Sequence, residues 1–386
     1  MSRVNGVENK ARTGCFLSAL RDKFLDSSEF NMSDINILNY LGFATQSDFE
    51  KKYPLNSVMN HLRSFLCPNS SLTASFRIVY EYDPDWLQRQ KRRILDDSDP
   101  RNSQATLGEL RAYADLLGLN CEVIANGTQK GTDFSLKDRA GHTVNVEVFT
   151  MQARPKSTID LGTTKDVWIE KDRTGKCSKY LMTTRISESI PYGIPDSNKP
   201  GDSTQANMIS KICSIKADGH QAKTDIPTLL HIDFRSMEMN YTQLPHCSPF
   251  LSGNGVLTAG GNWLAFYGEE GIPIPGQQSV LDDDFVLMQH PGRFSIGNKD
   301  CFCGAFLSYD QPPHCECGHR IVFFENPERP FLPESFKRLI STSALINWEL
   351  SCWQYDGFNL KAYIGIQNSR LKMVFKQFKS KCIFEL

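Results

Sequence analysis

The sequence predicts a mixed α/β fold, because helical and strand patterns alternate through residues 103–234. Residues 103–119 place apolar side chains three and four positions apart, as an amphipathic helix does, and the strand pattern CEVIANG follows. Residues 131–150 alternate apolar and polar side chains around a turn signal at 138–141, which is typical of a hairpin. A second helical pattern at residues 205–219 precedes the apolar strand IPTLLHIDF. This order indicates a mixed sheet with helices on its faces.

Length and composition indicate several packed units. One hydrophobic core rarely accommodates 386 residues, and 40% hydrophobic with 23% charged residues is the composition of a globular chain. We therefore predict four parts: a mainly helical N-terminal domain at 1–100, a core at 101–235, a β-rich extension at 236–340 and a C-terminal segment with a basic tail at 341–386. Within the first part, the sequence SFRIVYEY predicts a short strand.

No apolar stretch is long enough to span a bilayer, and the first residues lack the apolar centre of a secretory signal. We therefore expect a soluble, intracellular protein of the cytoplasm, without a membrane partner. In that compartment most of the 12 cysteines would be reduced thiols.

Charge is distributed unevenly along the chain. The net charge of −1 excludes the overall positive charge of a histone-like DNA binder. Residues 153–223 nevertheless carry 12 basic and 8 acidic side chains, and residues 358–386 carry 6 and 1, whereas residues 224–357 carry 7 and 16. A polyanion would therefore be attracted to the middle segment and to the tail.

Three acidic residues lie on three consecutive predicted elements. Glu109 lies on the first helix, Asp133 opens the first hairpin strand and Glu147 lies near the end of the second. A turn centred on residues 139–140 pairs positions whose numbers add up to 279 or 280, which places Asp133 opposite Glu147 on one face. A divalent cation such as Mg²⁺ or Mn²⁺ would offset the repulsion between them. The alternative is that all three are ordinary solvent-facing acids.

The succession of a helix with Glu, a strand, Gly-Thr-Asp-Phe, a hairpin, Val-Glu-Val, a helix and a strand resembles the core of the PD-(D/E)XK nuclease superfamily. The resemblance covers about residues 100–235, and more faintly 236–340. It implies a restriction-endonuclease-like mixed sheet flanked by helices. It also implies that Asp133 and Glu147 bind catalytic Mg²⁺ or Mn²⁺ and that Glu109 takes the role of the first-helix acid.

The activity implied is that of a Mg-dependent endonuclease, a hydrolase that cleaves phosphodiester bonds of DNA, in a setting of defence against foreign DNA. The partner implied is nucleic acid, chiefly DNA, while a homo-oligomer or a defence-system partner is left open.

One position departs from the family pattern. The second hairpin strand of the family usually carries Lys two residues after its acid, and this chain has Phe149 there. The basic group could instead come from Lys156, Lys211 or Lys216, and Gln152 could orient a water. Lys211 and Lys216 both lie on the helix expected to border the site, and an exposed helix face would also explain both. Of the two we name Lys211 as the catalytic candidate. A nucleic-acid-binding or scaffold protein that retains the fold without cleaving is the alternative.

Two Cys-x-Cys pairs form a second candidate site. A hairpin that turns at residues 311–313 could bring together Cys301, Cys303, Cys315 and Cys317, and four thiolates can hold a structural Zn²⁺. Thiols packed in the core of the hairpin are the alternative. A zinc site would favour a third function class, a zinc-stabilised interaction module.

Overall fold

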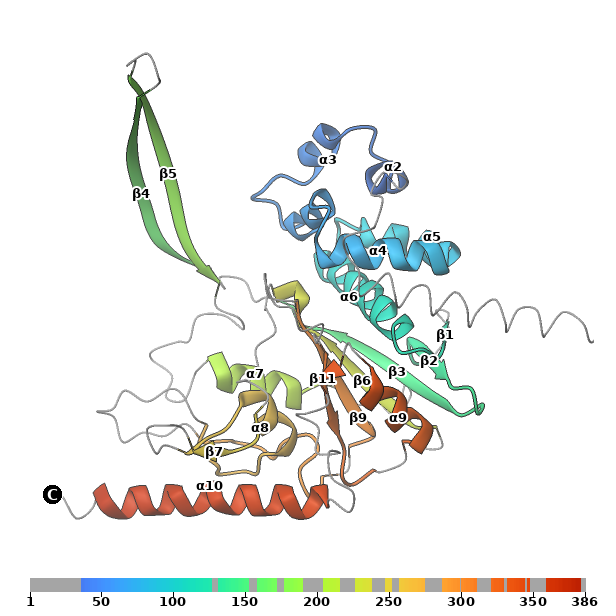
Figure 1. The fold of residues 1–386 in the computed structure, drawn as a ribbon, viewed down its shortest axis with the longest axis vertical. Helices are drawn as coiled ribbons and strands as arrows, with labels where there is room; N and C mark the ends of the chain where they lie inside the picture. The colour runs from blue at the N-terminus through green and yellow to red at the C-terminus, as the bar shows by residue number, and fades with distance from the viewer. Residues whose placement is uncertain are drawn as a thin grey trace, which may run out of the picture.

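The structure is a computed structural model, and Figure 1 shows its elements. The residues described are 36–126, 131–152, 158–171, 177–189, 204–215, 226–237, 247–251, 257–274, 287–298, 300–310, 321–329, 332–343, 346–347 and 359–382. The helices are α2 (Ile37–Leu41), α3 (Gln46–Lys52), α4 (Ser71–Tyr82), α5 (Pro84–Ile94), α6 (Pro100–Leu117), α7 (Thr204–Cys213), α8 (Gly261–Tyr267), α9 (Glu334–Thr342) and α10 (Leu360–Cys382), with 3₁₀ turns η1 (Asn60–Leu66) and η2 (Arg235–Met237). The strands are β1 (Glu122–Ala125), β2 (Phe134–Lys137), β3 (Thr143–Thr150), β4 (Thr158–Lys171), β5 (Cys177–Ser189), β6 (Thr228–Asp233), β7 (Phe250–Leu251), β8 (Leu257–Thr258), β9 (Gly304–Ser308), β10 (Ile321–Glu325) and β11 (Ile346–Asn347).

A seven-stranded sheet in the order β1-β2-β3-β6-β9-β10-β11 organises the described residues. Strands β1, β2 and β3 form an antiparallel meander, β6 runs parallel to β3, and β9 runs parallel to β6. β10 is antiparallel to β9 and parallel to β11. The mixed α/β class predicted from the sequence is therefore confirmed. The strands that follow residue 300 extend the same sheet rather than forming a separate one.

Helices cover both faces of this sheet (Figure 1). On one face, apolar residues of α4, α5, α6 and α9 form a continuous cluster with Val144, Val146, Leu229 and Phe323 of the strands. On the other face, α7, α8 and part of α10 pack against a second cluster that includes Leu230, Ile232 and Leu307. The side chains of β6, β9 and β10 are buried throughout, as expected for strands covered on both sides.

Helix α6 has clear start and stop signals. The Asp99 side chain accepts a hydrogen bond from the Arg101 amide, Pro100 occupies the first turn, and Gly118 caps the end. The predicted apolar stripe, which includes Leu110 and Leu117, is buried. The prediction of this helix is confirmed. Glu109 lies on α6, which packs on the face of the sheet with the first cluster.

The strand predicted for SFRIVYEY is wrong, because these residues belong to helix α4. Ser70 caps the helix by accepting a hydrogen bond from the Thr73 amide. Leu72, Phe76 and Val79, at helical spacing, are fully buried in the first cluster. Burial of this stripe outweighs the strand preference of the β-branched and aromatic residues.

No helix in the described part of the chain is long and apolar enough to cross a membrane.

Candidate functional site

The β2–β3 hairpin places Asp133 and Glu147 together. Phe134 pairs with Val146 and Ser135 with Asn145, so paired positions add up to 280, as the sequence predicted. Continued by one residue, this register places Asp133 opposite Glu147. The Val148 amide donates a 2.8 Å hydrogen bond to Asp133 Oδ2, which fixes that carboxyl at the end of the hairpin.

Polar residues continue along the same face of the hairpin. Ser135 Oγ donates to Asn145 Oδ1 at 2.9 Å, and Asn126 Nδ2 donates to Ser135 Oγ at 3.0 Å. Alternation along β2 and β3 places Ser135 and Asn145 on the side of Asp133 and Glu147. The two carboxyls therefore lie next to a row of hydrogen-bonded polar residues on one face of the hairpin. The valines of β3 lie on the other face and contact the first cluster.

A close helix–strand approach brings Glu109 to the hairpin. A Cβ atom at Gly108 would lie only 1.8 Å from Thr150 Oγ1, so only glycine allows α6 to lie this close to β3. Thr150 Oγ1 in turn donates to the Ala105 carbonyl at 3.3 Å. Gly108 precedes Glu109, and the contact therefore determines how near that acid lies to the strands.

The three carboxyls influence one another electrostatically. Burial, with a further contribution from the Glu109 charge, raises the pKa of Asp133 to about 7. Burial, followed by the charges of Asp133 and Glu109, raises the pKa of Glu147 to about 8. Glu147 Oε2 is buried and has no hydrogen-bond partner in the described structure. A buried carboxyl oxygen with no donor is a costly arrangement unless something else satisfies it.

Arg93, on α5, pairs with Glu109 and was not identified from the sequence. Its Nη2 lies 2.8 Å from Glu109 Oε1 and its Nη1 lies 3.0 Å from Oε2, a two-point contact. The guanidinium also donates to Gln90 Oε1 at 2.9 Å. The Arg93 charge lowers the pKa of Asp133 slightly against the effect of burial. The only sequence signal for this residue is the basic run KRR shortly before the Glu109 helix.

Lys211, on α7, lies over Phe149, two residues after Glu147 on β3. Its Nζ is 5.5 Å from the centre of the Phe149 ring. Glu147 and Phe149 pair with Leu230 and Ile232 of β6, so both lie on the sheet face that α7 covers. An amine from α7 therefore stands above the strand position two residues after the acid.

Gln152, the residue predicted to orient a water, is hydrogen-bonded elsewhere. Gln152 Nε2 donates to the Arg101 carbonyl at 2.9 Å, at the start of α6. Lys156 and Lys216 lie outside the described residues.

Asp133 and Glu147 are the residues with which this site could hold a cation. In the part of the chain that the structure describes, no group of three or more His, Cys, Asp or Glu side chains is arranged to hold a metal ion. Mg²⁺ commonly takes only one or two protein carboxylates and keeps waters in its other positions. The orphan Glu147 Oε2 and the pair of opposed carboxyls fit a hard dication of this kind.

The cysteine site can be described only in its first half, because Cys315 and Cys317 lie outside the described residues. Cys303 is buried in the first cluster and lies 3.2 Å from the Thr228 carbonyl, whereas Cys301 packs against the second cluster. Burial raises the pKa of Cys303 to about 12 and that of Cys301 to about 11. Cys303 is thus a buried side chain and Cys301 a partly buried one, on different clusters.

A buried ionic network links α6 to the end of β6. Arg111 Nη1 lies 3.0 Å from Asp233 Oδ2, Arg235 contacts the other oxygen of Asp233, and Arg235 Nη2 lies 2.9 Å from Asp115 Oδ2. His231 Nε2 lies 3.0 Å from Ser308 Oγ. All these charges are almost completely buried, and two guanidinium groups balance two carboxylates. The network therefore holds the Glu109 helix on the sheet.

Asp138, His142 and Ser335 form a Ser-His-Asp cluster that lacks the geometry of a catalytic triad. His142 Nδ1 lies 2.9 Å from Asp138 Oδ2 and 3.2 Å from Ser335 Oγ. Both partners meet the same ring nitrogen, so the imidazole cannot pass a proton from serine to carboxylate. Burial favours the protonated acid, yet hydrogen bonds from Ser335 and His142 hold the pKa of Asp138 at about 2. The cluster ties α9 to the β2–β3 turn.

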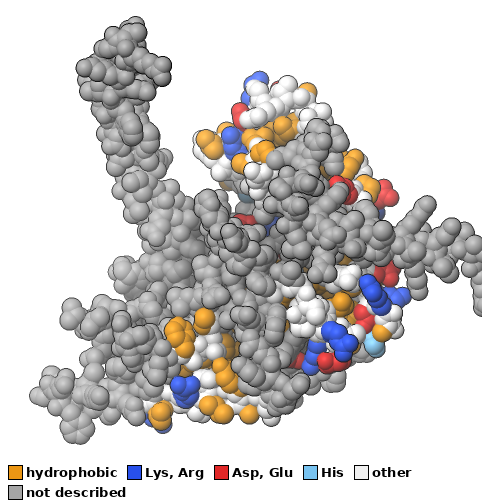
Figure 2. Space-filling model, in the orientation of Figure 1, with side chains coloured by type: hydrophobic (Ala, Val, Ile, Leu, Met, Phe, Trp, Pro, Cys, Tyr) orange, Lys and Arg blue, Asp and Glu red, His pale blue; other side chains and the backbone are white. Residues whose placement is uncertain are grey.

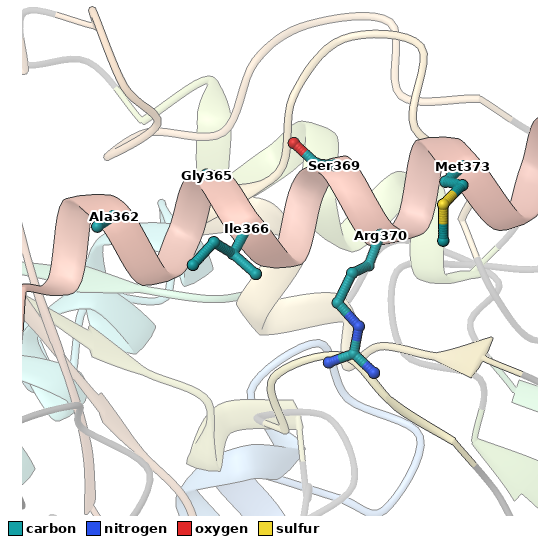
Figure 3. A pocket seen from close by; sticks show the side chains of 6 residues that line it. All are labelled: Ala362, Gly365, Ile366, Ser369, Arg370 and Met373. Atoms are coloured by element: carbon teal, nitrogen blue, oxygen red, sulfur yellow. The ribbon is translucent and has the colours of Figure 1, made fainter.

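A surface hollow of about 500 Å³ lies along α10 (Figure 3). Two exposed apolar side chains, Ile366 and Met373, take part in its lining. The described residues that line it come from one face of the helix: Ala362, Gly365, Ile366, Ser369, Arg370 and Met373. None is a carboxylate or histidine, so the hollow offers no acid–base chemistry.

Comparison with known proteins gives no relative: no model of a known protein family matches the chain, and no curated protein or solved structure matches it significantly.

Proposed function

We propose that the chain is a metal-dependent nuclease that hydrolyses phosphodiester bonds of DNA at the site formed by Asp133, Glu147 and Glu109. The observation that carries this proposal is the convergence of two half-buried carboxyls from neighbouring strands, one with a buried and unsatisfied oxygen, beside a third acid. Buried acids with strongly shifted pKa values gather at functional sites more often than elsewhere.

The order of elements supports a restriction-endonuclease-like core. Helix α6, the antiparallel meander β1-β2-β3, helix α7 and the parallel strand β6 occur in this order along the chain, with β4 and β5 inserted between β3 and α7. The four strands lie in the order β1-β2-β3-β6 in the sheet. This is the succession in which the PD-(D/E)XK resemblance was found. The acids occupy the helix, the start of the second strand and the third strand of that unit.

Each residue has a distinct part in the proposed reaction. Asp133 and Glu147 would hold Mg²⁺ or Mn²⁺, which when bound lowers the pKa of a water and stabilises negative charge on phosphate. Lys211 would orient the attacking water and take its proton, the work that Phe149 cannot do. Arg93 supplies a guanidinium at the edge of the site, where a phosphate could exchange for Glu109 as its partner.

The proposal is tested by cleavage of linear and supercoiled DNA with the full chain in Mg²⁺ and in Mn²⁺. Glu147→Gln keeps the size of the side chain and removes its charge, and we expect at least a 100-fold loss of cleavage rate. Glu122→Gln, the same change at an exposed acid of β1, is the matched control and should cleave as the wild type does. Circular dichroism checks that both variants are folded. Equal cleavage by wild type and Glu147→Gln would overturn the proposal.

A second candidate function, a DNA-binding protein that no longer cleaves, is favoured by one observation. Phe149 stands where the motif lysine is expected, and Lys211 lies over its ring. Wild-type protein that binds DNA but cleaves neither single- nor double-stranded substrate in either metal would establish this alternative.

A further inference from the structure

The β4–β5 ribbon, formed by Thr158–Lys171 and Cys177–Ser189, is a long two-stranded hairpin that stands away from the sheet (Figure 1). At about 3.3 Å per residue, strands of 14 and 13 residues extend about 40 Å. In the sequence the ribbon lies between β3, which carries Glu147, and α7, which carries Lys211. The chain thus leaves the candidate site, forms the ribbon and returns to the site.

Strand register sorts the charged residues of the ribbon by sign. Beyond the bulge at residues 160–162, one face carries Thr163 opposite Arg185, Lys165 opposite Thr183, Val167 opposite Leu181, Ile169 opposite Lys179 and Lys171 opposite Cys177. This face holds four basic positions and no acidic one. The other face carries Asp166 opposite Met182, Trp168 opposite Tyr180 and Glu170 opposite Ser178, with two acidic positions and no basic one. Two further acidic positions, Asp160 and Glu188, lie on the other side of the bulge, at the base of the ribbon.

Only the face of the ribbon with the four basic positions has the charge to attract a polyanion. The basic positions fall on neighbouring levels of the ribbon, Arg185 next to Lys165 and Lys179 next to Lys171, and neighbouring levels of one face lie about 7 Å apart. This is about twice the 3.4 Å axial spacing of charges along one DNA strand. A two-stranded ribbon also fits the major groove of B-form DNA, which is about 12 Å wide. The major groove of duplex RNA is too narrow and deep for it.

We infer that the β4–β5 ribbon is a binding arm for duplex DNA, and that its face with Lys165, Lys171, Lys179 and Arg185 meets the DNA backbone at the major groove. The inference deepens the proposed nuclease function, on which it rests for the identity of the polyanion. The chain connects the arm to β3 at one end and to α7 at the other, and these two elements carry Glu147 and Lys211.

The test measures binding rather than cleavage, with the full chain in EDTA and a fluorescent 30-base-pair duplex at several salt concentrations. The variant Lys179→Gln with Arg185→Gln removes two basic positions from the inferred contact face. If each contacts a phosphate, the slope of log K against log salt falls by about 1.8, and affinity at 0.1 M salt drops at least about tenfold.

Two controls separate this effect from general electrostatics. Lys137→Gln with Arg139→Gln makes the same change of charge at exposed residues of the β2–β3 turn. At the lower right of Figure 2, where this turn and α9 lie, basic side chains stand among acidic ones, and this is the surface chosen to compete with the ribbon. Asp166→Asn with Glu170→Gln alters the opposite face of the ribbon. Neither control should lower the slope, and a thermal melt confirms that each variant is folded.

The outcomes decide between the two proposals. An unchanged slope for the ribbon variant, or an equal loss from the turn variant, overturns the inference. Equal weakening of binding to single-stranded DNA or duplex RNA overturns the assignment to the DNA groove. EDTA prevents cleavage, so an unchanged salt slope in the ribbon variant would contradict only the binding arm and not the nuclease proposal. Cleavage at the wild-type rate by Glu147→Gln would contradict only the nuclease proposal and not DNA binding by the arm.

Discussion

Arg93 and Glu109 form a two-point ion pair between helices α5 and α6, with nitrogen–oxygen distances of 2.8 and 3.0 Å. The guanidinium side chain is 35% exposed and the carboxylate 16%. The pair connects the N-terminal helices to the candidate site. The Arg93 charge also offsets part of the negative charge of the three acids, and it lowers the pKa of Asp133.

We expect Arg93 and Glu109 to be energetically coupled. A double-mutant cycle with Arg93→Gln and Glu109→Gln, followed by urea unfolding at pH 8, should give a coupling of about 1 kcal/mol. Arg93→Lys should recover only part of it, because an ammonium group cannot make the two-point contact. A coupling indistinguishable from zero would show that the pair does not stabilise the fold.

The raised pKa values predict that stability without metal decreases with rising pH. Asp133 and Glu147 have folded-state pKa values of about 7 and about 8, above their ordinary values of 3.8 and 4.5. Between pH 4.5 and about 8 the folded protein therefore holds protons that the unfolded chain has released. The free energy of unfolding in EDTA should fall through this range, by at most about 1.4 kcal/mol per pH unit for each carboxyl.

Glu147→Gln should flatten this pH profile, since the amide does not titrate. Mg²⁺ added to the wild type at pH 8 should restore stability, and the gain at 100 times the dissociation constant is about 2.7 kcal/mol. Removal of the metal with EDTA should reverse it. A wild-type profile identical to that of Glu147→Gln would contradict the burial of this acid.

The contact between Gly108 and Thr150 predicts a sharp loss of stability for Gly108→Ala. The added methyl group would overlap Thr150, so α6 must move away from β3. We expect a loss of about 1–3 kcal/mol in urea unfolding. Gly365→Ala on α10 is the matched control, because its Cβ would make only an ordinary 3.7 Å contact with Ile296. This control should be neutral or stabilising by up to about 1 kcal/mol. Similar effects at both positions would contradict the close approach.

The role of Lys211 can be tested by moving its amine to position 149. Lys211→Ala should lower the cleavage rate about 100-fold or more, as expected for loss of a group that transfers a proton. Phe149→Lys in the same protein places an amine at the position the motif prefers and should recover part of the rate. Lys211→Ala that cleaves at the wild-type rate would remove this residue from the reaction.

The buried network predicts that Asp233→Asn is strongly destabilising. The change leaves Arg111 and Arg235 with too little negative charge in an interior that excludes water. Loss of one partner of a buried ion pair typically costs about 3–5 kcal/mol. Asp97→Asn, which breaks the exposed contact with Lys52, should change the unfolding free energy little. Equal effects in urea unfolding would show that the network contributes no more than a surface pair.

The sequence by itself determined the elements of the core and the pairing of the hairpin. The turn at residues 138–141 ends in Gly141, whose φ of 89° is a conformation that glycine adopts readily. That turn and the alternation of valines fix the register, so Asp133 opposite Glu147 could be predicted. The stripe on α6 and its caps are local signals of the same kind. The strand preference of SFRIVYEY is a local signal too. In the structure these residues form helix α4, because that helix buries its apolar face against α6.

Only the tertiary structure decided which charges meet. Arg93 reaches Glu109 across 16 positions, Lys211 lies over Phe149 from another helix, and Arg111 pairs with Asp233 across 122 positions. No periodicity encodes these contacts, because each depends on how two separately formed elements pack. The pKa values of the acids follow from that packing as well, since burial comes from every neighbour of a residue and not from its place in the sequence.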